Sequence, residues 1–302
     1  MKFLLLNFIL LSVFAFDNNN NKNIPINDFI DNYKLSMISY CNKDSILQNC
    51  GEMCKELKIK KKITYSEIFY DSKLNILMWF FDTEKDGVYL VFRGTQMKSV
   101  ANWIENLHVS QDLYICLFSE RCCHHCKIHT GFLNMLEWIE DKLHASDYWK
   151  KFIDENKKIN IIGHSLGGAL ATIVSVHYLN TYEHWNPDNV HVYTFGSPRV
   201  GNLNFSMYFD KNIKNKYRVV NRYDIIPHLP PNIKFLDHFP EYIHVGNEYW
   251  INNNFIKLCT NTSNEYNEDF SCSFNAEKTL LSDHYYFFDL ENQVKELFTF
   301  CL

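Results

Sequence analysis

The stretch Ile161-Ile162-Gly163-His164-Ser165-Leu166-Gly167-Gly168-Ala169-Leu170 decides the fold class of this chain. It places G-x-S-x-G between a β-branched run at 158–162 and an Ala-rich apolar run at 166–179. A strand before the motif and a helix after it are the context of a nucleophile elbow. Glycines on both sides of the serine remove Cβ atoms that would clash in so sharp a turn. The start of the following helix offers free N–H groups to developing negative charge, so we predict that Ser165 is a nucleophile.

A serine nucleophile needs a base and an orienting acid, which in this kind of fold follow it in the order acid, base. Asp224 comes just after the β-branched run at 217–220, where catalytic loops begin, and His284 is the last histidine. Chain order alone leaves rivals open. They are Asp188 and Asp210 for the acid, and His228 and His238 for the base.

Apolar runs elsewhere in the chain predict one α/β domain. We expect helices at 28–41, 132–143 and 166–179, and strands at 74–81, 88–92, 158–162, 190–195 and 217–220. Asp86-Gly87 is a hairpin signal, and the runs 242–245 and 249–255 also have the pattern of a hairpin. The central order of strand, helix, strand and strand indicates an α/β sheet.

Composition excludes several classes of protein. The chain has 302 residues, a formal net charge of −5 and 46% hydrophobic residues. Such a chain is too apolar to be disordered and has no net positive field to attract nucleic acid.

The N-terminus has the features of a secretory signal. Lys2 precedes an apolar run from Phe3 to Phe16, which is too short to span a membrane but has the length of a signal-peptide core. We expect cleavage after Ala15, which leaves residues 16–302 as one secreted domain. No second apolar run is long enough to cross a bilayer.

If the chain is secreted, its ten cysteines are expected to form disulfides, because an even number of cysteines in an oxidising compartment indicates disulfides. They are Cys41, Cys50, Cys54, Cys116, Cys122, Cys123, Cys126, Cys259, Cys272 and Cys301. A zinc site between Cys122 and His129 is a rival reading that the oxidising compartment disfavours, so we expect no metal. Sequons begin at Asn204 and Asn261.

Several motifs together resemble the class 3 lipases, the secreted triacylglycerol lipases of filamentous fungi. The matching segments are Val91-Phe92-Arg93-Gly94-Thr95, Ser99-Val100-Ala101-Asn102-Trp103-Ile104, His129-Thr130-Gly131-Phe132, residues 163–170, Thr194-Phe195-Gly196-Ser197-Pro198-Arg199-Val200-Gly201-Asn202, Asp224-Ile225-Ile226-Pro227 and Asp283-His284. They follow the family order and cover about residues 70 to 290.

The resemblance implies an α/β-hydrolase fold: a mostly parallel central sheet with flanking helices and a helical lid. It implies Ser165 as nucleophile, Asp224 as acid and His284 as base, with Thr95 and Leu166 as the oxyanion hole. It further implies a monomer that needs no cofactor and cleaves acylglycerol esters at a lipid surface. An esterase acting on phospholipid or feruloyl esters and a non-catalytic lipid-binding protein are the alternatives.

The predicted lid begins at Ser99, a plausible N-cap. Val100, Trp103, Ile104 and Leu107 form one apolar helical face. Periodicity alone favours an ordinary surface helix, and only the position implied by the resemblance makes it a lid.

The resemblance also implies the disulfides Cys41–Cys301 and Cys259–Cys272, which leave Cys50 and Cys54 as a local pair. Sequence does not choose among pairings of the other four cysteines. One departure is Phe287, because the family often has tyrosine at that position.

Overall fold

The computed structural model describes residues 15–16, 24–47, 50–105, 110–114, 123–182, 184–232, 240–252, 255–260, 268–275 and 278–301. The strands are β1 (Ala15–Phe16), β2 (Ile63–Asp71), β3 (Ile76–Thr83), β4 (Val88–Phe92), β5 (Gln111–Leu113), β6 (Lys127–His129), β7 (Ile159–His164), β8 (Val190–Phe195), β9 (Asn215–Asn221), β10 (Glu248–Asn252) and β11 (Phe255–Cys259). The helices are α1 (Ile26–Ile38), α2 (Lys43–Leu47), α3 (Gly51–Lys61), α4 (Val100–Glu105), α5 (Thr130–Ala145), α6 (Asp147–Glu155), α7 (Leu166–Thr181), α8 (Leu203–Asn212) and α9 (Glu291–Cys301).

One large sheet forms the centre of the molecule, with the strand order β1-β11-β10-β9-β8-β7-β4-β3-β2. The strands from β4 through β7, β8 and β9 to β10 are parallel, whereas β2, β3 and β11 join antiparallel neighbours. Residues of β4 and β7 are buried along their whole length, which explains why these segments read as continuous apolar runs.

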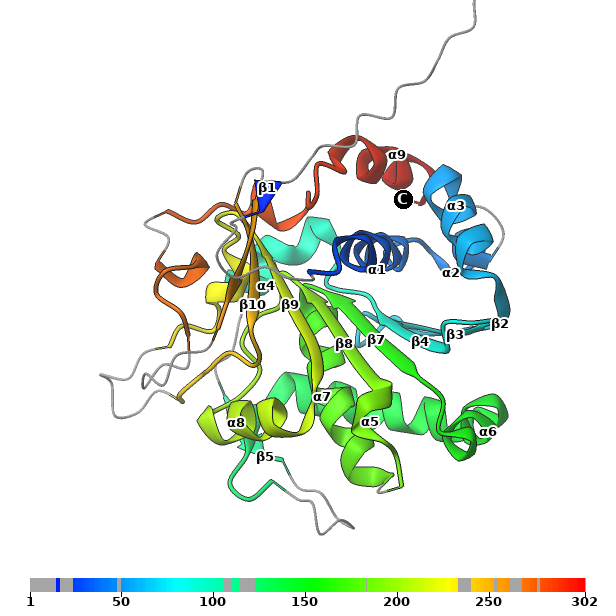
Figure 1. Ribbon diagram of the computed structural model, residues 1–302, viewed down its shortest axis with the longest axis horizontal. Coiled ribbons are helices and arrows are strands. Elements are labelled where there is room, and N and C mark those ends of the chain that lie inside the picture. The colour runs from blue at the N-terminus through cyan, green and yellow to red at the C-terminus, as the bar shows by residue number, and fades with distance from the viewer. Residues whose placement is uncertain are drawn as a thin grey trace, which may run out of the picture.

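Helices cover both faces of this sheet. In Figure 1, α1, α3 and α9 lie on one side, and α5, α6, α7 and α8 lie on the other. Alternate side chains of β3 separate accordingly, since Met78 and Phe80 belong to the core under α5–α8 and Trp79 and Phe81 to the opposite core. This architecture confirms the predicted α/β-hydrolase fold class.

The turn at Asp86-Gly87 is where the sequence predicts it, and β3 (76–83) begins and ends two residues later than the predicted strand 74–81. β4 spans the predicted residues 88–92 and pairs antiparallel with β3. Gly87 has φ +81°, and a Cβ there would collide with the Lys158 carbonyl oxygen. A glycine is therefore required at this turn.

The prediction of a second hairpin, between residues 242–245 and 249–255, is wrong. β10 pairs with β11 and not with residues 242–245. In that segment Ile243 makes only an isolated bridge to Gly201, although Tyr242 and Ile243 are fully buried. The apolar run reflects a buried loop, because burial without alternation does not distinguish a strand from other buried backbone.

The disulfides join distant and local parts of the chain. Cys41–Cys301, Cys50–Cys54 and Cys259–Cys272 are present, which confirms the three implied pairings. Cys123 pairs with Cys126, while Cys116 and Cys122 lie outside the described residues.

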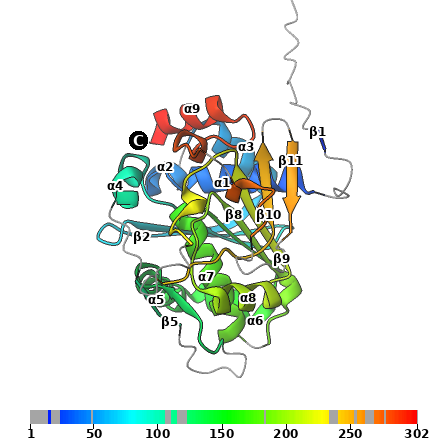
Figure 2. The ribbon, with the colours of Figure 1, turned by 90° about the vertical axis from the view of Figure 1, so that its left-hand side faces the viewer.

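The predicted signal segment is described only at its end. Ala15 and Phe16 form β1, which runs parallel to β11 at the sheet edge (Figure 2). Within the described part of the chain, no helix combines the length and the hydropathy needed to cross a membrane.

Candidate active site

Ser165 occupies the sharp turn between β7 and α7. Its φ of 58° and ψ of −131° lie in a region that non-glycine residues rarely adopt. A Cβ at Gly163 would collide with the Gly167 backbone, and a Cβ at Gly167 would collide with the Phe92 carbonyl. The two glycines of the motif therefore allow the strained turn that presents Ser165 at the end of β7.

Asp224 and His284 meet although 60 residues separate them. His284 Nδ1 lies 2.8 Å from Asp224 Oδ2, and both side chains are fully buried. The Ile226 N–H donates to Asp224 Oδ1 at 2.9 Å. Asp224 follows β9, His284 ends a 3-10 turn, and a bridge from Asp224 to Leu280 joins the two loops.

The hydrogen bond to Asp224 fixes which nitrogen of His284 accepts a proton. Because the carboxylate accepts at Nδ1, the neutral ring carries its proton there and has a lone pair on Nε2. Among the described residues, Nε2 is buried and has no hydrogen-bond partner. The imidazole is thus set to accept a proton from a group that approaches Nε2.

Burial opposes charge on both members of the pair. It lowers the pKa of His284 to about 3. It raises the pKa of Asp224 to about 8, against the opposing effect of the Ile226 N–H. Burial therefore disfavours charge on either group, and the Nδ1–H···Oδ2 hydrogen bond offsets part of that cost for the carboxylate.

Gly196 makes room for this pair, a role that the sequence reasoning did not assign to it. It follows β8 with φ +55°. A Cβ there would lie 2.6 Å from Asp224 Oδ2 and 2.8 Å from His284 Nδ1. The Ser165 N–H donates to the Phe195 carbonyl at 2.9 Å, so the same strand end touches the nucleophile.

The two residues predicted for the oxyanion hole belong to backbone segments close to Ser165. Leu166 is the first residue of α7, so its N–H belongs to the free helix start. Thr95 is buried and follows Gly94, at which a Cβ would lie 2.9 Å from the Ser165 Cβ. The structure therefore brings both backbone segments next to the serine.

The rival acids and bases are engaged elsewhere. Asp188 pairs with Lys214, and Asp210 accepts from the Gly246 N–H at 2.6 Å. His228 lies 3.0 Å from both the Asp224 and the Ser273 carbonyl oxygens, so it faces backbone. His238 lies outside the described residues.

The described residues include only part of the predicted lid helix. α4 spans Val100–Glu105, and Ser99 ends the 3-10 turn before it. Val100 is buried and Ile104 half-buried, while Trp103 packs against the core under α5–α8. Leu107 lies outside the described residues.

Phe287, the departure from the family pattern, is fully buried behind the site. Its ring meets the His164 ring edge-on, with centroids 6.0 Å apart. The position therefore contributes apolar packing where a tyrosine would add a hydroxyl.

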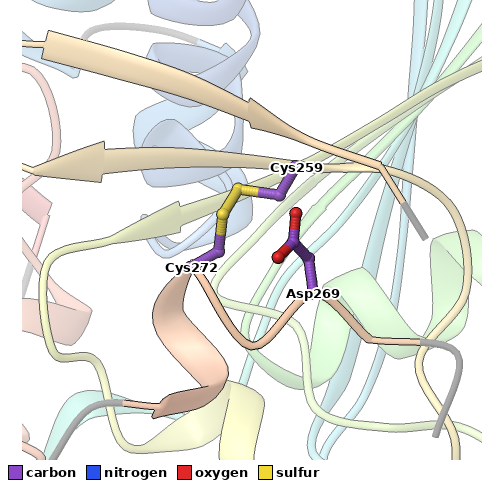
Figure 3. Close-up of side chains that lie close together, drawn as sticks. All are labelled: Cys259, Asp269 and Cys272. Atoms are coloured by element: carbon purple, nitrogen blue, oxygen red, sulfur yellow. A yellow bond between two sulfur atoms is a disulfide. The ribbon is translucent and has the colours of Figure 1, made fainter. Parts of the chain in front are cut away.

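Two groups of side chains have the composition of a metal site. Cys259, Asp269 and Cys272 lie together, but Figure 3 shows the two sulfurs bonded to each other. Asp269 accepts from the Ser271 N–H and hydroxyl. In the zinc-like cluster, Cys123 and Cys126 are likewise bonded. Because a metal binds thiolates, the four disulfide sulfurs are not available as ligands.

Because two histidines are buried and uncharged, we predict that the fold loses stability in mild acid. Burial lowers the pKa of His164 to about 3 and that of His244 well below its ordinary value. Below pH ~6.5 the unfolded chain binds protons that these folded histidines do not. The free energy of unfolding therefore decreases as the pH is lowered, by up to ~1.4 kcal/mol per pH unit for each histidine. The His284–Asp224 pair adds little, because its two shifts have opposite effects: the lowered pKa of His284 costs stability in acid, and the raised pKa of Asp224 adds stability there.

The measurement is the free energy of unfolding in denaturant from pH 7.5 to 5. His244→Gln retains a donor for the Pro227 carbonyl, 2.6 Å from His244 Nε2, and should give a shallower slope. A free energy that stays level or rises toward pH 5 would contradict the prediction.

Comparison with known proteins adds independent findings. The family model "Lipase (class 3)" matches residues 89–234. A lipase of Rhizomucor miehei is 32% identical over 246 residues, which cover 78% of this chain and 61% of the relative. The chain spans between about half and three-fifths of the length of the first curated relatives it matches.

Solved structures are similar over more of their length. One is a triacylglycerol lipase whose catalytic centre is a serine protease triad, with TM-score 0.73, 26% identity, and coverage of 89% of this chain and 96% of that one. Another is a fungal lipase–inhibitor complex interpreted as a model for interfacial activation, with TM-score 0.71, 27% identity, and coverage of 88% and 94%.

Proposed function

The chain belongs to the class 3 lipase family, and from this premise we propose that it is a secreted serine hydrolase that cleaves acylglycerol esters. The observation that carries the proposal is the buried His284–Asp224 hydrogen bond at the end of the sheet that also presents Ser165 on its elbow. No metal or organic cofactor takes part in the proposed reaction.

Acyl transfer begins when Ser165 Oγ attacks the ester carbonyl carbon and His284 Nε2 takes the hydroxyl proton. Asp224 stabilises the imidazolium that forms and keeps Nδ1 protonated. His284 then gives the proton to the departing alcohol, which leaves an acyl-enzyme on Ser165. Water, deprotonated by the same imidazole, releases the fatty acid and restores the serine.

The negative charge of each tetrahedral intermediate develops on the former carbonyl oxygen. We assign its stabilisation to the Leu166 N–H at the start of α7 and to the Thr95 N–H with its hydroxyl. Donors fixed before the reaction stabilise the transition state by ~3 kcal/mol each, because they need no reorganisation.

We assign the lid to Ser99–Leu107, which includes α4. In water its apolar residues face inward, as Val100 and Trp103 do in the described structure. At a lipid surface the helix would move outward and bury the same side chains in lipid, which couples ester cleavage to the interface. The similarity to a fungal lipase interpreted as a model for interfacial activation supports this assignment.

The proposal includes a secreted monomer. Cleavage after Ala15 would release residues 16–302 into an oxidising compartment, and the four disulfides of the described chain fit that compartment. Glycans at Asn204 and Asn261 belong to the same proposal. Asn204 is exposed on α8, and Asn261 lies outside the described residues.

A substrate comparison tests the reaction. We expect hydrolysis of emulsified triolein to rise sharply once the substrate exceeds its solubility, and a soluble aryl ester to show no such rise. A fluorophosphonate probe should label Ser165 stoichiometrically. Preference for phospholipid or feruloyl esters would assign another substrate to the same site, and absence of labelling would indicate a non-catalytic lipid-binding protein.

A further inference from the structure

A tyrosine from the N-terminal part of the chain reaches the back of the active site. Tyr40 follows α1, is buried, and precedes Cys41, whose disulfide to Cys301 fixes this end of the helix to α9. Its hydroxyl lies 2.8 Å from Nδ1 of His164, the fully buried residue before Ser165.

The other nitrogen of His164 contacts the base. His164 Nε2 lies 2.6 Å from the backbone oxygen of His284, and the two rings lie with centroids 4.4 Å apart. A carbonyl oxygen only accepts, so Nε2 must carry the proton. Burial lowers the pKa of His164 to about 3, which keeps the ring neutral and makes Nδ1 the acceptor for the Tyr40 hydroxyl.

The Tyr40 hydroxyl also contacts the turn that carries Thr95. A Cβ at Gly94 would collide with this hydroxyl, so the turn packs directly against it. Each hydrogen bond in this chain of contacts therefore has one direction. The Tyr40 O–H donates to His164 Nδ1, and His164 Nε2–H donates to the His284 carbonyl. No other arrangement satisfies Tyr40, His164 and the His284 carbonyl together while His164 stays neutral.

We propose that Tyr40 and His164 are positioning residues, which hold the oxyanion turn, the nucleophile and the base in register through this hydrogen-bond chain. The inference rests on the proposed ester hydrolysis for its functional meaning. Neither side chain is assigned a proton of the reaction, since His164 contacts His284 through its backbone oxygen and not through the imidazole Nε2.

The same helix supports the base at a second point. Tyr33, which lies on α1 seven residues before Tyr40, donates to the Tyr285 carbonyl at 2.5 Å. Its oxygen accepts from the Phe287 N–H at 3.4 Å. The backbone from His284 to Phe287 is thus held by two tyrosines of the N-terminal helical region, by Tyr40 through His164 and by Tyr33 directly.

The test begins with Tyr40→Phe, which removes one oxygen and keeps the ring. Active sites are counted by fluorophosphonate titration, and kcat per titrated site is measured with a soluble aryl ester. We expect kcat to fall about 10-fold to 100-fold with KM within about two-fold, since a buried acceptor loses its donor. A merely structural role would lower the number of titratable sites and leave kcat per site unchanged.

Tyr193→Phe is the matched control. Tyr193 is buried in the same core as Tyr40, and within the described part of the chain its hydroxyl makes no hydrogen bond. Its kcat should equal that of the wild type. Two substitutions of His164 test whether its hydrogen bond matters. His164→Gln keeps an N–H group that can donate to the His284 carbonyl, so it should retain a higher kcat than His164→Leu.

Nitrogen-15 NMR of the histidine rings separates this inference from the proposed function. His164 should be neutral with its proton on Nε2 at pH 7 in the wild type and in Tyr40→Phe, because the His284 carbonyl accepts from Nε2 in both. Loss of the Tyr40 donor should move the Nδ1 resonance of Tyr40→Phe downfield, toward that of a nitrogen that accepts no hydrogen bond. This readout needs no catalysis, so a wild type without esterase activity would defeat the proposed function alone. A protonated or Nδ1–H His164 in the wild type, or unchanged kcat in Tyr40→Phe, would overturn the inference.

Discussion

Ser165→Ala is expected to lower kcat for ester hydrolysis by about 10⁴-fold to 10⁶-fold and to abolish fluorophosphonate labelling. Alanine has no atom that can form the acyl-enzyme, so only binding and the oxyanion donors would still accelerate attack by water. The fold should persist, because the Ser165 backbone and not its hydroxyl makes the hydrogen bonds to Phe195 and Gly168.

Ser175→Ala controls for the loss of a buried serine hydroxyl. Ser175 lies on α7, is fully buried, and its hydroxyl donates to the Thr172 carbonyl at 2.8 Å. Its loss should cost about 1 kcal/mol of stability and leave kcat unchanged. Hydrolysis of triolein or an aryl ester by pure Ser165→Ala at more than a thousandth of the wild-type rate would refute the assigned nucleophile.

Asp224→Asn is expected to lower kcat by about 10⁴-fold while KM stays close to the wild-type value. The amide is nearly the same size as the carboxylate, so the packing around it survives. An amide nitrogen facing His284 Nδ1 would donate to it and move the ring proton to Nε2, where it blocks proton transfer from Ser165. The Ile226 N–H bond to Oδ1 favours this orientation, because it keeps the amide oxygen on that side.

Asp188→Asn is the matched control, since Asp188 precedes Asp224 in the chain and was its rival on chain order. Asp188 is paired with Lys214 away from His284, so kcat should not change. Loss of activity in Asp188→Asn with retention in Asp224→Asn would reverse the assignment of the acid. The pH profile of kcat, measured alongside, distinguishes a changed tautomer from a misfolded site.

Local sequence could predict the elbow because its constraints are local. Gly163 and Gly167 act on neighbouring backbone, and the β-branched run before them and the Ala-rich run after them are adjacent in the chain. Predicted strands 88–92 and 190–195 match β4 and β8 for a related reason, since strands buried on both faces have continuous apolar sequences. The strand predicted at residues 242–245 was wrong, because a buried loop also has a continuous apolar sequence.

Partners across the sheet could not be predicted this way. Chain order left two rival acids beside Asp224 and two rival bases beside His284. The resemblance to class 3 lipases, and not any local pattern, favoured Asp224 and His284. Nothing about Gly196 in the sequence says that it lies under both of them. The Tyr40 contact joins residues 124 positions apart, and no periodicity relates them.

What the sequence by itself determined is the α/β class, the elbow at Ser165 and a secretory cysteine content, each set by residues close together in the chain. Only the tertiary structure decided which carboxylate faces which imidazole, which ring nitrogen of His284 and of His164 carries the proton, and which tyrosine supports them. The physical reason is that hydrogen-bond geometry depends on distance and direction in space. Those quantities exist only after β7, β8 and β9 have aligned their ends and α1 has packed across them.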